Sequence, residues 1–392
     1  MIDIARTSAE LLDNERLSTR LAALVRSESE NPPGNEKRVA EITAAFCEEL
    51  GLSVEMHEVE PGRPSVVARW FGGEGPTLTY CSHIDVVPAG NADLWDHDPY
   101  SGHVADGRLY GRGSGDAKGP CAAALEAVAV LKASGLSPKG TLELAFVADE
   151  ESGGFKGAAP LVADGVLNPS VAIVGEPTSL RVVRAQRGIA WLKITTHGVA
   201  GHGSAPERGI SAIRHMADLI LRLEETLPDI EHPLLGRPTV NVGTISGGEK
   251  LNIIPASCVI EVDRRIVPGE DESSMLETIQ DAIALTRQRF PEVDARVEVV
   301  SMGDPFEVPE SAPVVQHAVR AIEQATGATP DIIGFRGASD ARFMADAGAD
   351  VIVCGPGDIQ LAHTARESID LEELRSGAHA YALMFASLLE MS

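Results

Sequence analysis

Short apolar runs that alternate with helical segments constrain the fold of this chain more than any other feature of its sequence. A helix is predicted at residues 121–133, where apolar residues recur at helical spacing. Strands that alternate with helices predict an α/β sheet covered by helices on both faces. The apolar runs that predict its buried strands are residues 66–71, 77–81, 142–148, 171–174 and 351–353.

The N-terminal region and the length of the chain add information about the domains. Helical spacing at residues 17–25 and 39–50, separated by the turn Asn31-Pro32-Pro33-Gly34, predicts that the chain opens with two helices. With 392 residues, the chain exceeds the size at which one core usually stops growing, so we expect two domains.

A different pattern begins near Arg187 and predicts a smaller second domain. Its order, β-α-β-β-α-β, is that of a ferredoxin-like split-βαβ sandwich. Because the strand at 351–353 resembles the earlier buried strands, we expect this domain to be inserted into the first. The expected boundaries are 1–186 and 301–392 for the two parts of the first domain, and 187–300 for the insertion. The six elements of the insertion are expected at residues 189–195, 210–227, 239–246, 256–266, 273–290 and 295–300.

Composition excludes some classes of function. The formal net charge of -25 repels nucleic acid and anionic membrane surfaces, so neither is an expected partner. The five cysteines are scattered and form no Cys-x-x-Cys motif, which argues against a disulfide framework or a thiolate zinc site and favours a reducing cytoplasm. The sequence has neither a recognisable export signal nor an apolar run long enough to span a membrane.

Side chains that bind metals follow four of the predicted strands. In open α/β sheets, ligands bind in the crevice beyond the carboxyl ends of the strands, so these side chains are expected to meet in one pocket. Nitrogen and carboxylate ligands without thiolates suit catalytic zinc, manganese or cobalt. A single histidine or glutamate at such a position is more often a surface or packing residue, but several equivalent positions favour a metal site. These residues are His83 with Asp85, Glu150 with Glu151, Glu176 and His363.

Two pairs of neighbouring residues suggest a division of roles. His83 and Asp85 lie two apart at a strand end, so His83 can bind metal while Asp85 accepts a hydrogen bond from its other ring nitrogen. A solvated turn is the alternative interpretation of this pair. Glu150 and Glu151 are adjacent and point opposite ways in an extended segment, so one can bind metal while the other, Glu150, takes a proton from water.

The glycine-rich segment that ends at Asp116 could be mistaken for a phosphate loop. Its spacing, Gly-x-Gly-x-Asp, is not the dinucleotide fingerprint, and Asp116 would occupy the place of a negative phosphate. We therefore interpret Asp116 as a carboxylate that bridges two metals, with glycines that permit a tight backbone.

Nine segments together resemble the acetylornithine deacetylase and succinyl-diaminopimelate desuccinylase family of co-catalytic zinc amidohydrolases, which also includes aminoacylases and several peptidases. The resemblance covers nearly the whole chain, and the segments occur in the family's order. They are SHIDVVP, LYGRGSGDAKG, ADEESGG, GEPT, GVAGHGSAP, LNIIP, DRRIVPG, ASDAR and AHTARE.

The resemblance implies roles for individual residues. Asp116 would bridge two zinc ions, for which cobalt or manganese could substitute. His83 and Glu176 would complete one site, and Glu151 and His363 the other. The peptide bond Asp116–Ala117 would be cis, and the inserted domain would act as a lid that mediates a homodimer. His202 from the neighbouring subunit would then stabilise the oxyanion, and Asn252 and Arg265 would contact the substrate.

Arg342, in the segment Ala338-Ser339-Asp340-Ala341-Arg342, could bind the α-carboxylate of a substrate through two parallel hydrogen bonds, with Ser339 beside it. An ion pair of Arg342 with Asp340 or Asp346 is the structural alternative. Many relatives have Thr where this chain has Ala338, so their substrate preference does not carry over directly.

The expected reaction is hydrolysis of the amide bond of an N-acyl amino acid. The metals activate water, Glu150 acts as general base and returns the proton to the leaving amine, and closure of the lid excludes water. A dipeptidase or carboxypeptidase with the same mechanism is the nearest alternative. A non-catalytic binding or assembly protein is a remote one, because the ligand set is complete and Glu150 is intact.

Overall fold

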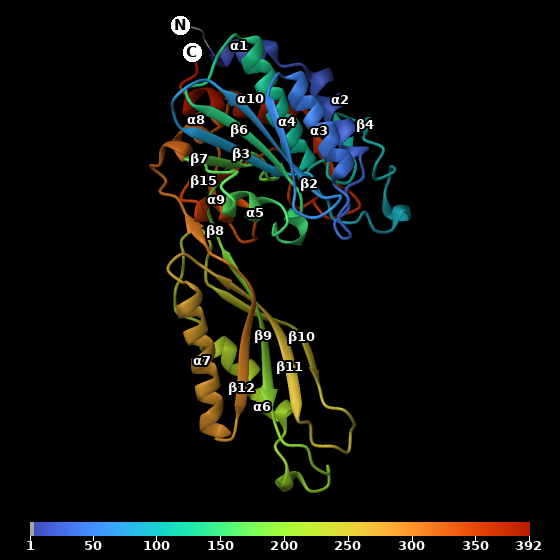
Figure 1. The fold of residues 1–392 in the computed structure, drawn as a ribbon, viewed down its shortest axis with the longest axis vertical. Helices are drawn as coiled ribbons and strands as arrows, with labels where there is room; N and C mark the ends of the chain where they lie inside the picture. The colour runs from blue at the N-terminus through green and yellow to red at the C-terminus, as the bar shows by residue number, and fades with distance from the viewer. Residues whose placement is uncertain (1–3) are drawn as a thin grey trace. The chain divides into compact units, whose positions relative to one another are not determined.

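A computed structural model describes residues 4–392 of the chain and divides it into two compact units (Figure 1). The first unit contains the chain up to Arg184, Val308–Ile333 and Ser339–Ser392. The second unit contains Ala185–Glu307 and Gly334–Ala338. Each unit has its own sheet and helices.

A mixed sheet forms the centre of the first unit. Its middle strands β6, β3, β7 and β15 are parallel, while β1, β2 and β8 pair antiparallel to their neighbours. This architecture confirms the predicted α/β fold, and its central sheet is mixed. In spatial order the strands are β1 (Ser53–Glu58), β2 (Pro64–Phe71), β6 (Thr141–Val147), β3 (Thr77–His83), β7 (Val171–Val174), β15 (Asp350–Val353) and β8 (Val182–Gln186), which also pairs with β13 (Phe306–Glu307) and β14 (Ile332–Phe335).

Helix α4 (Lys118–Ala133) is the best buried helix of the first unit. Apolar residues surround it on nearly every side, because it packs against β3, α2 and α10. A small separate sheet has the order β16 (Ser368–Asp370), β5 (Arg108–Tyr110) and β4 (His103–Ala105), and β16 leads directly into α10. The other helices are α1 (Ile4–Leu11), α2 (Asn14–Val25), α3 (Lys37–Glu49), α5 (Ala158–Ala163), α8 (Pro313–Thr326), α9 (Ala341–Asp346) and α10 (Leu371–Leu388).

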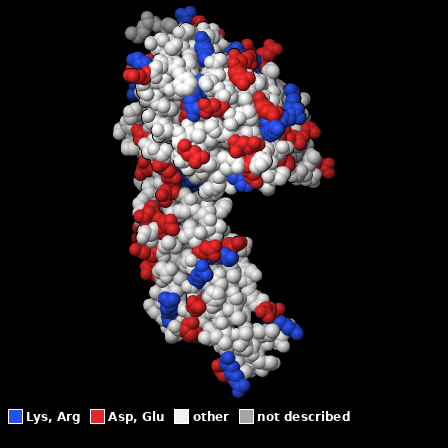
Figure 2. All heavy atoms as spheres, in the orientation of Figure 1, with Lys and Arg blue, Asp and Glu red and all other residues white. Residues whose placement is uncertain are grey.

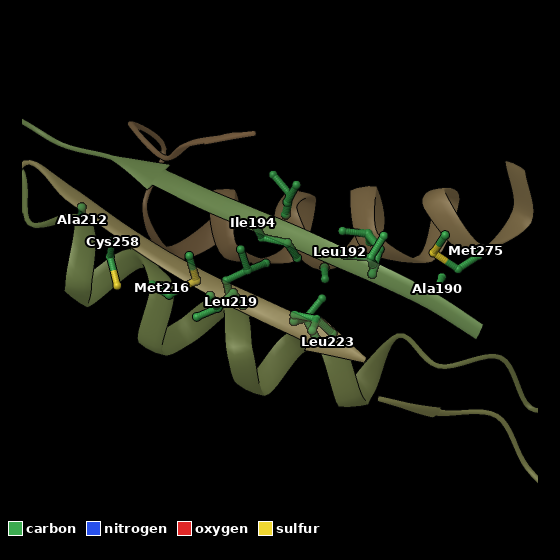
Figure 3. Close-up of a cluster of buried hydrophobic side chains, with 14 of the residues drawn as sticks. Ala190, Leu192, Ile194, Ala212, Met216, Leu219, Leu223, Cys258 and Met275 are labelled. Atoms are coloured by element: carbon green, nitrogen blue, oxygen red, sulfur yellow. The ribbon is translucent and has the colours of Figure 1, made fainter. Parts of the chain in front are cut away.

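The second unit is a four-stranded antiparallel sheet with two helices. The strand order is β10-β11-β9-β12, and the order along the chain is β9-α6-β10-β11-α7-β12. Apolar side chains from both helices and from the sheet form one buried core, as Figure 3 shows. The elements are β9 (Gly188–His197), α6 (Ala212–Glu225), β10 (Thr239–Gly247), β11 (Ser257–Ile266), α7 (Glu272–Arg289) and β12 (Asp294–Gly303).

Replacing Leu219 by alanine should destabilise the second unit by about 2–5 kcal/mol, because this fully buried side chain lies in the core and its removal leaves a cavity. Leu221 is a matched control on the same helix, since 62% of it is exposed. Leu221→Ala should change the free energy of unfolding by no more than about 0.5 kcal/mol. Urea denaturation of both variants measures the difference, and equal losses would contradict the assignment of the core.

None of the helices between residues 4 and 392 combines the length and the apolar character needed to cross a membrane. Acidic side chains are spread over the face shown in Figure 2, and basic side chains are scattered among them. This distribution agrees with the net charge of -25.

Candidate metal centre

Three parallel strands of the first unit bring their carboxyl ends to the same edge of the sheet. His83 ends β3 and pairs in register with Val147, the last residue of β6. Cys81 pairs with Val174, the last residue of β7. The segments that follow β6 and β7 therefore leave the sheet beside His83, as expected for a ligand site in an open α/β sheet.

Asp116 lies at the centre of the cluster that forms there. Its Oδ1 is 3.1 Å from Nε2 of His83, and its Oδ2 is 3.2 Å from Nε2 of His363. Nε2 of His83 is also 3.7 Å from Oε2 of Glu176, and Nε2 of His363 is 3.2 Å from Oε2 of Glu151. The other four side chains predicted as metal ligands thus converge around the carboxylate of Asp116.

The chemistry of this donor set fits divalent cations. His83, Asp116 and Glu151 each offer one ligand atom, and these three atoms lie within 4.8 Å of one another. Oε1 of Glu176 is buried and has no hydrogen-bond partner within residues 4–392, so a lone pair remains free for a ligand bond. Imidazole and carboxylate donors together suit a transition metal such as zinc.

The electrostatics of the cluster also favour positive charge at its centre. Burial disfavours a charged His83, but Glu176 and Asp116 outweigh it and raise the pKa of His83 well above its usual value. Hydrogen bonds to Asp116 and Glu151 raise the pKa of His363 to about 10. Desolvation raises the pKa of the Glu176 carboxyl to about 7, although His83 opposes that shift. Three carboxylates held this close require cationic neighbours.

Asp85 supports the cluster differently from the expectation. Nδ1 of His83 lies 2.9 Å from the backbone oxygen of Asp85 and 3.6 Å from its carboxylate Oδ1. The carboxylate instead accepts hydrogen bonds from the backbone N–H groups of Glu150 and Glu151, at 3.2 and 3.1 Å, and from Nδ2 of Asn31 at 2.8 Å. Asp85 therefore orients the two glutamates as well as the histidine.

The backbone at Glu150 and Glu151 is a 3-10 turn, Glu150–Ser152, and not the extended segment that was expected. It starts after Asp149, whose φ of 72° is left-handed. Glu151 still points at His363, while the carboxylate of Glu150 makes no hydrogen bond within the described chain. Desolvation is the largest cause that raises the pKa of Glu150 well above its usual value, and the negative charge of Glu176 is the second largest.

Arg342 and Ser339 lie in the first unit, and both are buried. The guanidinium of Arg342 donates to the backbone oxygen of Gly153 and lies over the ring of Phe343, 4.6 Å from its centroid. Nε of Arg342 has no hydrogen-bond partner among residues 4–392. Ser339 Oγ accepts a hydrogen bond from the N–H of Ala341 at 3.4 Å.

The other three predicted residues belong to the second unit. His202 and Asn252 are both exposed. They are neighbours, because His202 forms a β-bridge with Ile253, the residue after Asn252. Nδ1 of His202 accepts a hydrogen bond from the N–H of Ser204 at 3.2 Å. Arg265 is paired with Asp263 through two hydrogen bonds, at 2.8 and 3.0 Å.

Two residues that support the cluster were not identified from the sequence. Asn31 binds Asp85, and the turn Asn31-Pro32-Pro33-Gly34 was the only signal that marked it. Glu367 accepts the backbone N–H of Asp116 at 3.1 Å. Its place in the segment AHTARE, four residues after His363, could have suggested a supporting role.

Comparison with known proteins identifies matches over most of the chain. The family model described as Peptidase family M20/M25/M40 matches residues 80–387. An acetylornithine deacetylase of Myxococcus xanthus is 36% identical over 315 residues, which cover 77% of this chain and 78% of that protein. An acetylornithine deacetylase of Proteus mirabilis (strain HI4320) is 32% identical over 339 residues, 84% of each chain.

Solved structures share the fold. Aminopeptidase PepT from Bacillus cereus ATCC 10987 has a TM-score of 0.80 with 24% identity, covering 96% of this chain and 98% of that one. An M20 family metallo-carboxypeptidase from Sulfolobus solfataricus has a TM-score of 0.76 with 19% identity, covering 95% and 98%.

Proposed function

Since this chain belongs to peptidase family M20/M25/M40, a family of metal-dependent hydrolases that act on acyl amino acids or peptides, we propose that it hydrolyses the amide bond of an N-acyl amino acid with two metal ions. The observation that carries the proposal is the position of Asp116, whose two oxygens face two different histidines. A carboxylate placed in this way suits a bridge between two cations.

The proposed ligands divide into two sets that share Asp116. His83 and Glu176 belong to one set, and Glu151 and His363 belong to the other. Zinc is the proposed metal, with cobalt or manganese as substitutes, because the donors are nitrogen and oxygen without sulfur. When bound, such a pair lowers the pKa of water and polarises the amide carbonyl.

Glu150 is the proposed general base. Its carboxylate is free of hydrogen bonds within the described residues, and it lies close enough to Glu176 and His83 for their charges to shift its pKa. The side chain would take a proton from the attacking water and return it to the leaving amine. Asp85 holds the backbone of Glu150 and so would fix the position of this base.

Support for an acyl amino acid as substrate comes from the acetylornithine deacetylases that match most of the chain. The proposed contacts for the substrate are Arg342, Ser339, Asn252 and Arg265. A dipeptidase or carboxypeptidase of the same mechanism is a second candidate, because the solved structures with the same fold include an aminopeptidase and a metallo-carboxypeptidase.

A substrate panel tests the proposal. The purified protein, loaded with Zn²⁺, should hydrolyse N-acetyl or N-succinyl amino acids faster than dipeptides of the same amino acids. Faster cleavage of dipeptides would establish the peptidase alternative. No hydrolysis of either class by a protein that binds no metal would favour a binding or assembly protein.

The second unit is proposed to be an inserted lid that mediates a homodimer. In this arrangement His202 of a neighbouring subunit stabilises the oxyanion. The five cysteines are all buried and unpaired, which supports a cytoplasmic location.

Replacing His202 by alanine should lower kcat by about 100- to 1000-fold with little change in metal content, because one donor to the oxyanion is lost. Steady-state kinetics at saturating Zn²⁺ measure the effect. His197 offers a control on the second unit, since it ends β9 and has no proposed role. Equal activity of His202→Ala and His197→Ala would contradict a role of His202 in turnover.

A further inference from the structure

The structure contains a buried ion pair that connects the two loops carrying Asp116 and His363. Glu367 and Arg112 form this pair, with 1% and 2% of each residue exposed. Oε2 of Glu367 accepts a hydrogen bond from Nη1 of Arg112. Because β16 pairs with β5, the residues just outside this ladder, Glu367 and Gly111, are brought side by side.

Glu367 holds the backbone of the Asp116 loop directly. Its Oε1 accepts the N–H groups of Gly115 and Asp116, each at 3.1 Å, and its backbone oxygen accepts the N–H of Gly111 at 3.1 Å. A Cβ on Gly115 would meet Oε1 of Glu367 at 3.8 Å as its nearest atom. These two charge-assisted hydrogen bonds to one oxygen hold the backbone from which the carboxylate of Asp116 projects.

Arg112 holds the His363 loop from the other side. Its Nη1 lies 3.4 Å from the backbone oxygen of Thr364, the residue after His363, and its guanidinium lies over the ring of Trp95 at 5.1 Å. His363 has a φ of 61°, a left-handed conformation that a residue with a Cβ adopts only when its surroundings enforce it. The hydrogen bond from Arg112 to Thr364 holds the backbone next to this conformation.

The ligands on the other side are held by different contacts. His83 ends β3 and Glu176 follows β7, the parallel strand beside it, and Oγ of Ser82 donates to the backbone oxygen of Gly175 at 2.8 Å. Glu367 makes none of these contacts among the described residues. Loss of the ion pair therefore displaces Asp116 and His363 with respect to each other but leaves the pairing of β3 with β7 intact.

We infer that Glu367, clamped by Arg112, is a positioning residue that sets the separation of Asp116 and His363 and so controls the affinity of the metal site on the His363 side. This inference rests on the proposed two-metal function. Residues that orient metal ligands typically change metal affinity by about 10- to 100-fold when they are replaced.

Glu126 provides a matched control in the same unit. It is fully buried, accepts the backbone N–H of Asp13 at 2.9 Å, and pairs with Arg16 at 2.6 Å. Glu126 thus makes the same kinds of contact as Glu367, but it joins α4 to the start of α2. Neither Asp13 nor Arg16, the residues that it contacts, is a proposed ligand. Both variants lose a buried charge, while only one is linked to Asp116.

The experiment titrates the metal-free full-length protein with Co²⁺ alone, using chelator competition and the visible absorption spectrum of the bound ion. Glu367→Gln should weaken the equivalent on the His363 side by about 10- to 100-fold and the other equivalent, which shares Asp116, by a clearly smaller factor. The spectrum of the weakened equivalent should change, and Glu126→Gln should bind both equivalents as the unmodified protein does.

Equal binding curves and spectra for Glu367→Gln and Glu126→Gln would overturn the inference, as would equal weakening of both equivalents. If Glu367→Gln does not fold, Arg112→Lys takes its place, with selective weakening of one equivalent expected and unchanged binding overturning the role. Failure of the unmodified protein to bind two equivalents would instead refute the proposed two-metal function, so the two failures are distinguishable.

Discussion

Glu150→Gln is expected to lower kcat by about 100- to 10,000-fold while the protein keeps both metal equivalents. The amide has the size of the carboxylate but cannot accept a proton from water. Within the described chain, Glu150 forms no ion pair with His83 or His363. Loss of its charge should therefore not disturb the metal ligands. Metal analysis of the dialysed protein, followed by single-turnover kinetics, measures both properties.

Glu151→Gln is the matched control, since it makes the same chemical change one residue further along the chain. Oε2 of Glu151 is 3.2 Å from Nε2 of His363, so this variant should lose affinity for one metal equivalent. Excess Zn²⁺ should restore part of the activity of Glu151→Gln. It should not restore the activity of Glu150→Gln. Near-native turnover of the metal-loaded Glu150→Gln protein would show that another group is the base.

Asp116→Asn should have the largest effect on metal binding, with activity reduced to the rate in buffer. Asp116 is the only one of the five predicted ligands that contacts both histidines, so its loss affects both proposed sites. An asparagine supplies one oxygen and no negative charge, which leaves one histidine facing an amide nitrogen. Elemental analysis of the purified variant, with and without excess Zn²⁺, measures the stoichiometry.

Glu143→Gln controls for the loss of a buried carboxylate in the same unit. Glu143 is 3% exposed and pairs with Arg69 at 2.7 Å, away from the histidines. This variant should bind metal with unchanged stoichiometry even if it is less stable. Full metal occupancy in Asp116→Asn would exclude Asp116 as the bridging ligand.

The central strands were predicted closely because their apolar runs are nearly continuous. The strand expected at residues 171–174 is β7, and those expected at 77–81 and 142–148 are β3 and β6 with shifted ends. Helices α1, α8 and α10 and strand β1 were not predicted. The hydrophobic face of α8 becomes interpretable only when α10 is known to pack against it.

The family resemblance is confirmed by the match over residues 80–387, and the predicted cis peptide Asp116–Ala117 is present. The orientation of single side chains was predicted less well. Asp85 was expected to accept the ring nitrogen of His83 with its carboxylate, but its backbone oxygen is the nearer acceptor, and the carboxylate holds the backbone of Glu150 and Glu151. A spacing of two residues defines a side of a strand, but it does not determine which of several donors lies nearest.

The sequence by itself determined which chemical groups this protein has and at which strand ends they occur, because strand periodicity and ligand chemistry are local properties. The family resemblance implied that Asp116 lies between His83 and His363, but only the tertiary structure brings these side chains, from positions 280 residues apart, within 3.1 and 3.2 Å of its two oxygens. That meeting depends on parallel pairing of distant strands and on the pair Arg112–Glu367, contacts between segments that no local pattern encodes.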